Sequence, residues 1–168
     1  KRLRDMADQL IRVAAERELR KTEKIIPPAG LYEEFCAKFK YNETEDQLRS
    51  IEDTLIDFSS GKPMDRLVCG DVGFGKTEVA LRAAMVAAMH GLQVVIVAPT
   101  TLLCRQHYQV FVERFKDLPI KIRQLSRLIS AKDAAIIKSE LKSGECNIVI
   151  GTHAVLGKSI EFSNIGLL

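Results

Sequence analysis

Residues 66–80 read RLVCGDVGFGKTEVA, and the rest of the chain is organised around this stretch. A short apolar run at 67–69, predicted to be a strand, leads into Gly70–Thr77, GDVGFGKT, which fits the pattern G-x-x-x-x-G-K-[ST]. A helical pattern follows from Glu78. Strand, glycine-rich loop and helix is the context in which this pattern binds phosphate, so the sequence predicts a P-loop here rather than a chance glycine-rich turn.

The residue types in the loop suit a nucleoside triphosphate. Gly70, Gly73 and Gly75 allow backbone N–H groups to turn inward and approach phosphate oxygens closely. The helix that begins near Lys76 directs its positive dipole end at the same anion. Lys76 can reach the β- and γ-phosphates, and the Thr77 hydroxyl can bind Mg²⁺.

Beyond the P-loop, buried β-branched runs alternate with helical patterns. Strands are predicted at 93–98, 120–125, 147–151 and 165–168, and helices at 76–90, 102–116 and 130–143. This alternation predicts an α/β fold in which a parallel β-sheet carries helices on both faces.

The first part of the chain is predicted to be helical. Residues 3–24 carry an amphipathic pattern. Residues 1–24 hold eight Lys and Arg against five Asp and Glu, while the remainder holds 17 of each. A solvated helix packed on its neighbour is the preferred interpretation, and a connector to an upstream domain or a DNA contact are the alternatives. A second helix is predicted at 45–58, with Thr44 as N-cap and Gln47 in the capping-box position.

Composition excludes several classes of protein. The chain of 168 residues has room for one ordinary domain with a core. No run of about 18 apolar residues is present, so we expect no membrane partner, and no signal-peptide pattern is present, which favours the cytoplasm. Four widely spaced cysteines fit neither a zinc site nor a disulfide framework. The net charge of +3 is too small for a uniformly basic, nucleic-acid-coating surface.

Polar residues follow the predicted strands at one edge of the sheet, where ligands of open parallel sheets bind. Hydroxyl groups and helix N-termini at such an edge can hold backbone phosphates without reading base sequence. Each residue alone is explained by a helix cap, a turn or a partly buried histidine, but together they favour a motor that grips nucleic acid. The residues are Thr100, Thr101, Arg127, Thr152 and His153.

With these residues in view, the chain resembles the first motor lobe of the bacterial transcription-repair coupling factors, which are RecG-like translocases of helicase superfamily 2. The resemblance runs from about Tyr41 to the C-terminus. RecG-type branch-migrating helicases share the same arrangement of motifs, but Phe74 and the run at 77–80 are more similar to the coupling factors. The segments that carry the resemblance are Pro63–Ala80, Ala98–Leu103 with Gln106–Tyr108, Leu125–Arg127 and Ile150–His153.

The resemblance implies roles for individual residues. It implies that the lobe binds ATP and Mg²⁺, with Lys76 and Thr77 as catalytic residues and Thr77 as the metal ligand. Gln47 would sense the adenine, and Phe39 or Tyr41 would stack on it. The implied DNA contacts are Thr100, Thr101, Arg127, Thr152 and His153. The implied nucleotide-binding loop consists of Gly70, Asp71, Val72, Gly73, Phe74, Gly75, Lys76, Thr77 and Glu78.

The resemblance also implies an organisation and an activity. Residues 1–30 would be a connector helix, and 31–168 would be part of a RecA-like ATPase lobe. Such a lobe drives translocation on double-stranded DNA, which displaces stalled RNA polymerase and helps to recruit excision-repair proteins. The acidic motif that positions Mg²⁺ and water would follow the strand at 165–168. We therefore expect a piece of a longer protein that does not hydrolyse ATP alone.

Three other interpretations remain open from the sequence. The first is a RecG-type branch-migrating helicase. The second is a small-substrate P-loop kinase or GTPase, although the guanine motif N-K-x-D is absent and no arginine-rich lid follows the P-loop. The third is a protein-interaction fragment with a vestigial nucleotide site, for which the basic helix at 1–24 is the supporting feature.

Overall fold

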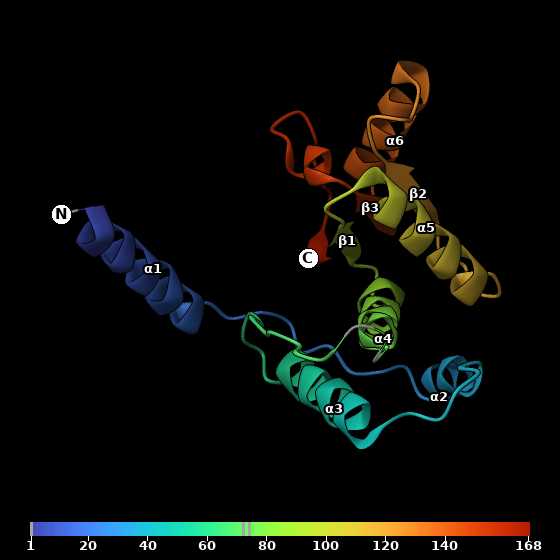
Figure 1. Ribbon diagram of the computed structural model, residues 1–168, viewed down its shortest axis with the longest axis horizontal. Coiled ribbons are helices and arrows are strands. Elements are labelled where there is room, and N and C mark those ends of the chain that lie inside the picture. Colours follow the sequence, from blue (N-terminus) through green and yellow to red (C-terminus); the bar gives the residue numbers. More distant parts are fainter. Residues whose placement is uncertain (1, 72, 74) are drawn as a thin grey trace. The chain divides into compact units, whose positions relative to one another are not determined.

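The computed structural model describes residues 2–71, 73 and 75–168. Their helices are α1 (Arg2–Leu19), α2 (Leu31–Ala37), α3 (Glu45–Ser59), α4 (Lys76–Met89), α5 (Thr101–Phe115), α6 (Ala131–Ser143) and the 3₁₀ turn η1 (His153–Leu156) (Figure 1). Their strands are β1 (Gln93–Val97), β2 (Ile122–Leu125), β3 (Ile148–Gly151) and β4 (Ile165–Leu167). None of these helices combines the length and apolar character that a membrane crossing needs.

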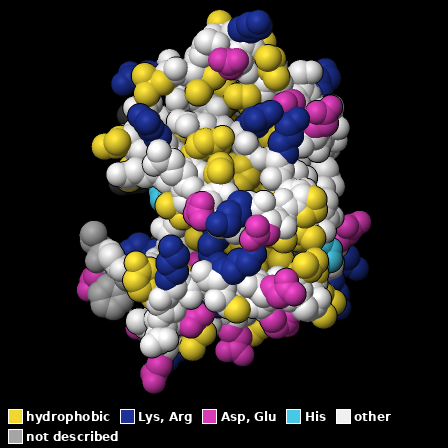
Figure 2. Space-filling model, turned by 90° about the vertical axis from the view of Figure 1, so that its right-hand side faces the viewer, with side chains coloured by type: hydrophobic (Ala, Val, Ile, Leu, Met, Phe, Trp, Pro, Cys, Tyr) yellow, Lys and Arg dark blue, Asp and Glu magenta, His cyan; other side chains and the backbone are white. Residues whose placement is uncertain are grey.

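The described chain divides into two compact units. One comprises the residues up to Pro27 together with Tyr41–Val79, and the other comprises Pro28–Lys40 together with Ala80–Leu168. The expected boundary between a connector at 1–30 and a lobe at 31–168 stays a prediction. Lys and Arg side chains are intermixed with Asp and Glu on the face drawn in Figure 2, in keeping with the small net charge.

The first unit is built on α3. Thr44 caps this helix as predicted, and the side chains of Ile51 and Phe58 on the helix are buried. The helix predicted at 3–24 ends at Leu19, five residues early. The backbone that follows it forms hydrogen bonds with the C-terminal end of α3 and the residues after it instead of continuing the helix. The N–H groups of Thr22 and Ile25 donate to the carbonyl oxygens of Gly61 and Phe58, each at 2.9 Å, which holds that segment along the end of α3.

The prediction of a strand at 67–69 is wrong for this structure. These residues are irregular, and Leu67 is 86% exposed. A strand is stable only when its N–H and C=O groups pair with a neighbouring strand, and β1–β4, the strands of the described residues, pair with one another instead. The apolar run therefore enters the P-loop as an irregular segment outside the described sheet.

The second unit contains a parallel sheet, as predicted. The described strands lie in the order β2-β3-β1-β4, and every pair between them is parallel. β1 and β3 are in register from Val94 opposite Ile148 to Val97 opposite Gly151, and β2 places Leu125 opposite the same Gly151. Three strands therefore end at one level.

Helices cover both faces of this sheet, which confirms the predicted α/β class. Side chains alternate between the faces of a strand. On one face α6 packs Ile137 and Leu141 against a buried cluster that contains Val95, Leu125 and Val149. On the other face lies α5, whose buried Cys104 places Sγ 3.4 Å from the carbonyl oxygen of Ile150.

The helix α2 was missed by the sequence analysis. It is a short element that packs in the second unit, where the Phe35 ring meets the Phe115 ring edge-on with centroids 5.0 Å apart. The Arg114 guanidinium lies over the same Phe35 ring, 4.4 Å from its centroid. Seven residues give too few helical repeats for a periodic signal, so packing of aromatic side chains decides this helix.

Candidate nucleotide site and nucleic-acid edge

The P-loop has the backbone geometry that its glycines permit. Gly73 and Gly75 have φ angles of +89° and +65°, a region that other residues rarely adopt. Immediately after them α4 begins at Lys76, and the Glu78 N–H donates to the Gly75 carbonyl oxygen at 2.9 Å. The turn therefore leads directly into a helix N-terminus, where unsatisfied N–H groups and the helix dipole favour an anion.

The Lys76 side chain folds back over the loop. Its Nζ donates to the carbonyl oxygens of Gly70 at 2.6 Å and Asp71 at 2.7 Å. These are neutral acceptors, so they orient the ammonium group without neutralising its charge. A positive charge is thereby held beside the helix N-terminus, at the place where a P-loop lysine meets phosphate.

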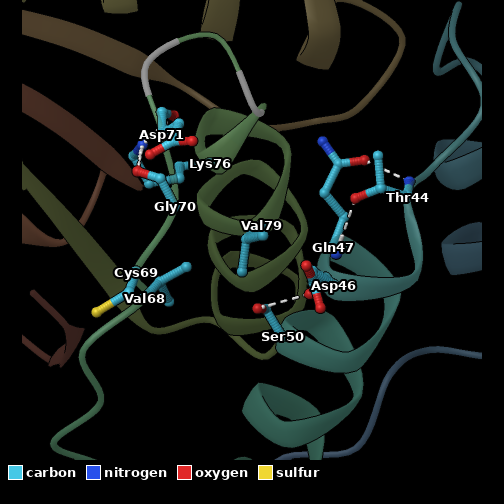
Figure 3. A pocket seen from close by; sticks show the side chains of 10 residues that line it. All are labelled: Thr44, Asp46, Gln47, Ser50, Val68, Cys69, Gly70, Asp71, Lys76 and Val79. Atoms are coloured by element: carbon cyan, nitrogen blue, oxygen red, sulfur yellow. Dashed lines mark hydrogen bonds between the residues drawn. The ribbon is translucent and has the colours of Figure 1, made fainter.

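A cavity of about 320 Å³ opens between the P-loop and the first turns of α3 (Figure 3). Its walls combine loop backbone, the Lys76 ammonium group and small polar side chains of α3. The Ser50 hydroxyl in this wall donates to the Asp46 carbonyl oxygen at 2.8 Å. The lining residues are Thr44, Asp46, Gln47, Ser50, Val68, Cys69, Gly70, Asp71, Lys76 and Val79.

The structure brings Gln47 to the P-loop, 28 positions before Gly75 in the sequence. Its backbone N–H donates to the Thr44 hydroxyl at 3.2 Å, and its Oε1 accepts from the Thr44 N–H at 2.8 Å. A methyl group built on Gly75 would overlap Gln47 Nε2. The amide of Gln47 therefore packs against the loop at Gly75, where a side chain is absent.

The other predicted nucleotide-binding residues have different surroundings. Thr77 is half-buried and Glu78 is buried in the first turn of α4. Tyr41 is 75% exposed and is not one of the described residues that line the cavity. Phe39 lies in the second unit, where the Arg82 guanidinium is 5.9 Å from its ring centroid. Val72 and Phe74 lie outside the described residues.

These features fit a nucleoside triphosphate. The cavity is roomy enough for a nucleotide, and the loop offers glycine backbone in place of side chains, with one ammonium group beside it. No group of three or more His, Cys, Asp or Glu that could hold a metal ion occurs among the described residues. Thr77 as the Mg²⁺ ligand stays a prediction.

Cavity residues other than the P-loop and Gln47 were not predicted from the sequence as site residues. Thr44 was recognised only as a cap, and Asp46, Ser50 and Cys69 were not singled out. For Ser50 a signal existed, because a residue three positions after Gln47 lies on the same face of a helix. Cys69 was not recognised because the run at 67–69 was interpreted as a strand. A residue in such a strand would be buried, whereas Cys69 is exposed.

The second unit brings the predicted nucleic-acid residues together at one edge. Val97, Leu125 and Gly151 lie side by side in register at the carboxyl ends of β1, β2 and β3. The residues that follow each strand therefore share this edge. They are Thr100 and Thr101 after β1, Arg127 after β2, and Thr152 and His153 after β3.

Local hydrogen bonds shape this edge. The Thr100 hydroxyl accepts from the Leu103 N–H at 3.2 Å and so begins α5, and the Thr152 N–H donates to the Leu125 carbonyl oxygen at 3.3 Å. Arg127 and His153 are exposed. Cap hydroxyls, a helix N-terminus and an exposed guanidinium are groups that contact phosphate.

Comparison with known proteins agrees with this geometry. A family model for the DEAD/DEAH box helicases matches residues 44–168, which is more than half of the chain. The chain belongs to the DEAD/DEAH box helicase family. The helicase match includes Gln47, the P-loop and the sheet edge, so the two candidate sites lie inside the family region.

Individual relatives of this helicase chain are similar over nearly its whole length. The transcription-repair-coupling factor of Rickettsia bellii is 51% identical over 99% of the chain, and that of Bacillus subtilis is 49% identical over 99%. The chain spans only 15% and 14% of these two relatives. The structure of RecG bound to a three-way DNA junction is 34% identical, with a TM-score of 0.85, and covers 93% of the chain and 22% of RecG.

Proposed function

We propose that this chain is the ATP-binding lobe of a protein that translocates on double-stranded DNA and couples transcription to excision repair. The observation that carries the proposal is identity of about half the residues to transcription-repair-coupling factors over 99% of the chain. The P-loop geometry and the cavity beside it support ATP as the nucleotide that is bound.

In this proposal the loop and α3 share the recognition of ATP. Backbone N–H groups of the loop and the Lys76 ammonium group bind the phosphates, and Gln47 contacts the adenine. Thr77 would hold Mg²⁺, and the ion would supply positive charge beside the phosphates. Phe39 or Tyr41 stacks on the base, and Asp71, Val72, Phe74 and Glu78 complete the nucleotide-binding segment.

The sheet edge is the proposed DNA surface. The hydroxyls of Thr100, Thr101 and Thr152, together with Arg127 and His153, contact the DNA backbone. Such contacts carry no base information, which suits a protein that must move along any sequence. The proposed macromolecular partners of the whole protein are RNA polymerase, which it displaces when stalled, and excision-repair proteins, all in the bacterial cytoplasm.

A RecG-type branch-migrating helicase is the second candidate, because a DNA-bound RecG structure matches with a TM-score of 0.85. Its 34% identity is below the 51% of the coupling factor, so the coupling function is preferred. A small-substrate kinase or GTPase does not agree with the helicase-family match.

The first test is the ATPase rate of the full-length protein with and without double-stranded DNA, beside Lys76→Ala. We expect DNA to raise the rate in the wild type and Lys76→Ala to abolish the increase. A matched control is Lys62→Ala, since Lys62 lies in the same unit but pairs with Glu18. A rate that does not respond to DNA would contradict the proposal.

A second test separates the two candidates. The full-length protein is added to an RNA polymerase stalled on DNA and, separately, to a branched DNA junction. Release of the stalled polymerase with ATP supports the coupling function. Junction unwinding without polymerase release would favour the RecG-type function instead.

A further inference from the structure

Each segment that follows a strand at the candidate nucleic-acid edge exposes a leucine. Leu102 follows β1, Leu128 follows β2 and Leu156 follows β3, and each of them is more than half exposed. A single exposed leucine is ordinary on a protein surface and needs no explanation by itself. Here the same feature recurs after three strands that end at one level.

Each of these segments has another apolar residue that packs inward. Cys104 and Val155 are fully buried, and Ile129 packs against the buried cluster on the α6 side of the sheet. In the turn after β2, the Ser126 hydroxyl accepts from the Leu128 N–H at 3.4 Å, while the Leu128 side chain stays outside the core. Packing of the described core therefore does not account for the exposed leucines.

The same segments carry positive charge and no carboxylate. The seven residues that follow each of β1, β2 and β3 include Arg127, Lys132 and Lys158 but no Asp or Glu, in a chain with 22 acidic residues. This charge pattern complements a polyanion such as nucleic acid. The three segments are 98–104, 126–132 and 152–158.

The backbone of duplex DNA offers apolar surface only at its sugars. The C2′ atom of deoxyribose carries hydrogen alone, whereas that of ribose carries a hydroxyl group that both donates and accepts hydrogen bonds. A leucine side chain against deoxyribose removes apolar surface from water. The same side chain against ribose would bury a hydroxyl group without a hydrogen-bond partner.

We propose that Leu102, Leu128 and Leu156 lie against the sugars of the bound duplex and make this edge selective for DNA over RNA. The cations and hydroxyl groups of the edge bind phosphates, which DNA and RNA share, so they cannot supply this selectivity. The inference rests on the proposed function, because it requires a nucleic-acid duplex at the edge.

The competing explanation is that another part of the whole protein covers these leucines. The chain spans only 15% of the Rickettsia bellii relative. Under that explanation, replacing the leucines lowers the stability of the full-length protein and leaves its choice between DNA and RNA unchanged. The two explanations therefore differ in sugar selectivity.

The variant that separates them carries Leu102→Asn, Leu128→Asn and Leu156→Asn together in the full-length protein. Asparagine is similar to leucine in size, but its amide group can hydrogen-bond to a ribose hydroxyl. The control carries Val110→Asn and Val112→Asn. These two valines are also exposed, but they lie about 13 to 16 Å along α5 from the sheet edge where this helix begins.

The readout is the ratio of Kd values for two duplexes of one sequence, measured by fluorescence anisotropy. One duplex is all DNA, and the other carries isolated ribonucleotides in both strands, so the number of phosphates is the same. For the wild type we expect Kd to be about five-fold higher for the ribonucleotide-containing duplex, the effect of about one hydroxyl group left unpaired. The triple variant should bring this ratio to about one, and the valine control should keep it.

The outcomes distinguish the inference from the function on which it rests. Failure of the wild type to bind either duplex overturns the proposed function. Equal Kd values for the two duplexes in the wild type, or an unchanged ratio in the triple variant, overturns the sugar contact alone. An unchanged ratio together with a lower melting temperature of the triple variant identifies the leucines as a surface covered by another part of the protein.

Leu128→Asn alone decides the matter if the triple variant does not fold. Leu128 lies in the turn between β2 and α6, outside the regular elements, so its replacement leaves their hydrogen bonds in place. A ratio that falls to about three supports the sugar contact. A ratio that stays at the wild-type value overturns it.

Discussion

Arg123 on β2 and Glu140 on α6 form a two-pronged ion pair, in which Nε lies 2.7 Å from Oε2 and Nη2 lies 2.9 Å from Oε1. Glu140 is 9% exposed and also lies 2.8 Å from Lys121 Nζ. This ion pair connects the last turn of α6 to β2, which is an edge strand of the described sheet. A buried carboxylate with such partners stabilises the fold only while it stays charged and paired.

Replacing Glu140 by glutamine is expected to destabilise the second unit. The substitution keeps the size of the side chain but removes the charge that two cations face, and we expect the free energy of unfolding to fall by about 2 kcal/mol. Urea denaturation followed by circular dichroism measures the change.

The control for this prediction is Glu145→Gln. Glu145 also pairs with Lys121, at 3.2 Å, but its side chain is 65% exposed. Exposed pairs contribute little, so a change of less than about 0.5 kcal/mol is expected. Equal losses in the two variants would show that burial of Glu140 is unimportant.

The same pair predicts a dependence of stability on pH. Hydrogen bonds from Arg123 lower the pKa of Glu140 from its ordinary value of 4.5 to about 2. Because the pKa is depressed in the folded state, the stabilisation is complete above the unfolded value and is lost as pH falls toward 2. The difference in unfolding free energy between wild type and Glu140→Gln should therefore shrink between pH 4.5 and pH 2. A difference that stays constant over this range would contradict the assignment.

Substitution of Gly75 by alanine is expected to weaken nucleotide binding. The residue has a φ angle of +65°, and its new methyl group would overlap the amide nitrogen of Gln47. We expect the affinity for ATP to fall at least about ten-fold, together with a loss of about 1 kcal/mol of stability from the backbone strain. Isothermal titration calorimetry with ATP gives the affinity.

Gly91→Ala is the control that separates the effect of backbone strain from the effect of the steric overlap with Gln47. Gly91 has a similar φ angle of +76°, but nothing lies within 4 Å of the added methyl group. It should lose a similar amount of stability and keep its affinity for ATP. If Gly91→Ala also lost ATP binding, the effect of Gly75→Ala would reflect general destabilisation.

Arg127→Ala tests the proposed DNA surface. An exposed guanidinium that neutralises one phosphate contributes about one unit to the slope of log affinity against log salt concentration. The variant should bind all duplex sequences more weakly and reduce that slope by about one. Fluorescence anisotropy at several salt concentrations measures both quantities in the full-length protein.

Lys116→Ala is the matched control for Arg127. Lys116 lies at the C-terminal end of α5, about 20 Å along the helix from the sheet edge where α5 begins. It is exposed and pairs with Glu113. An equal loss of DNA affinity in Lys116→Ala would mean that charge in general, and not this edge, holds the DNA.

Several features of the fold could be predicted because they depend on neighbours in the sequence. The caps at Thr44, Thr100 and Ser130 each use a hydroxyl that accepts from the N–H three residues later. Gly144 ends α6 with a φ angle of +84°, for which glycine is the natural residue. The positive φ angles of Gly73 and Gly75 have the same local origin.

Other features depend on parts of the chain that are far apart in sequence. The run at 67–69 has the composition of a strand, but no described strand pairs with it, so it stays irregular. Gln93 is 3% exposed, and its side-chain amide bonds to backbone atoms of Leu141, Cys146, Ser163 and Asn164. Nothing near Gln93 in the sequence indicates these partners.

The sequence by itself determined the P-loop, the N-caps of α3, α5 and α6, and the alternation that makes the second unit a parallel α/β sheet. These depend on φ preferences, hydrogen bonds over three or four residues, and apolar periodicity, all of which are local. Only the tertiary structure decided the strand order, the common edge of Val97, Leu125 and Gly151, and the contact of Gln47 with Gly75. Such contacts form between residues distant in sequence, and packing of the whole unit selects them.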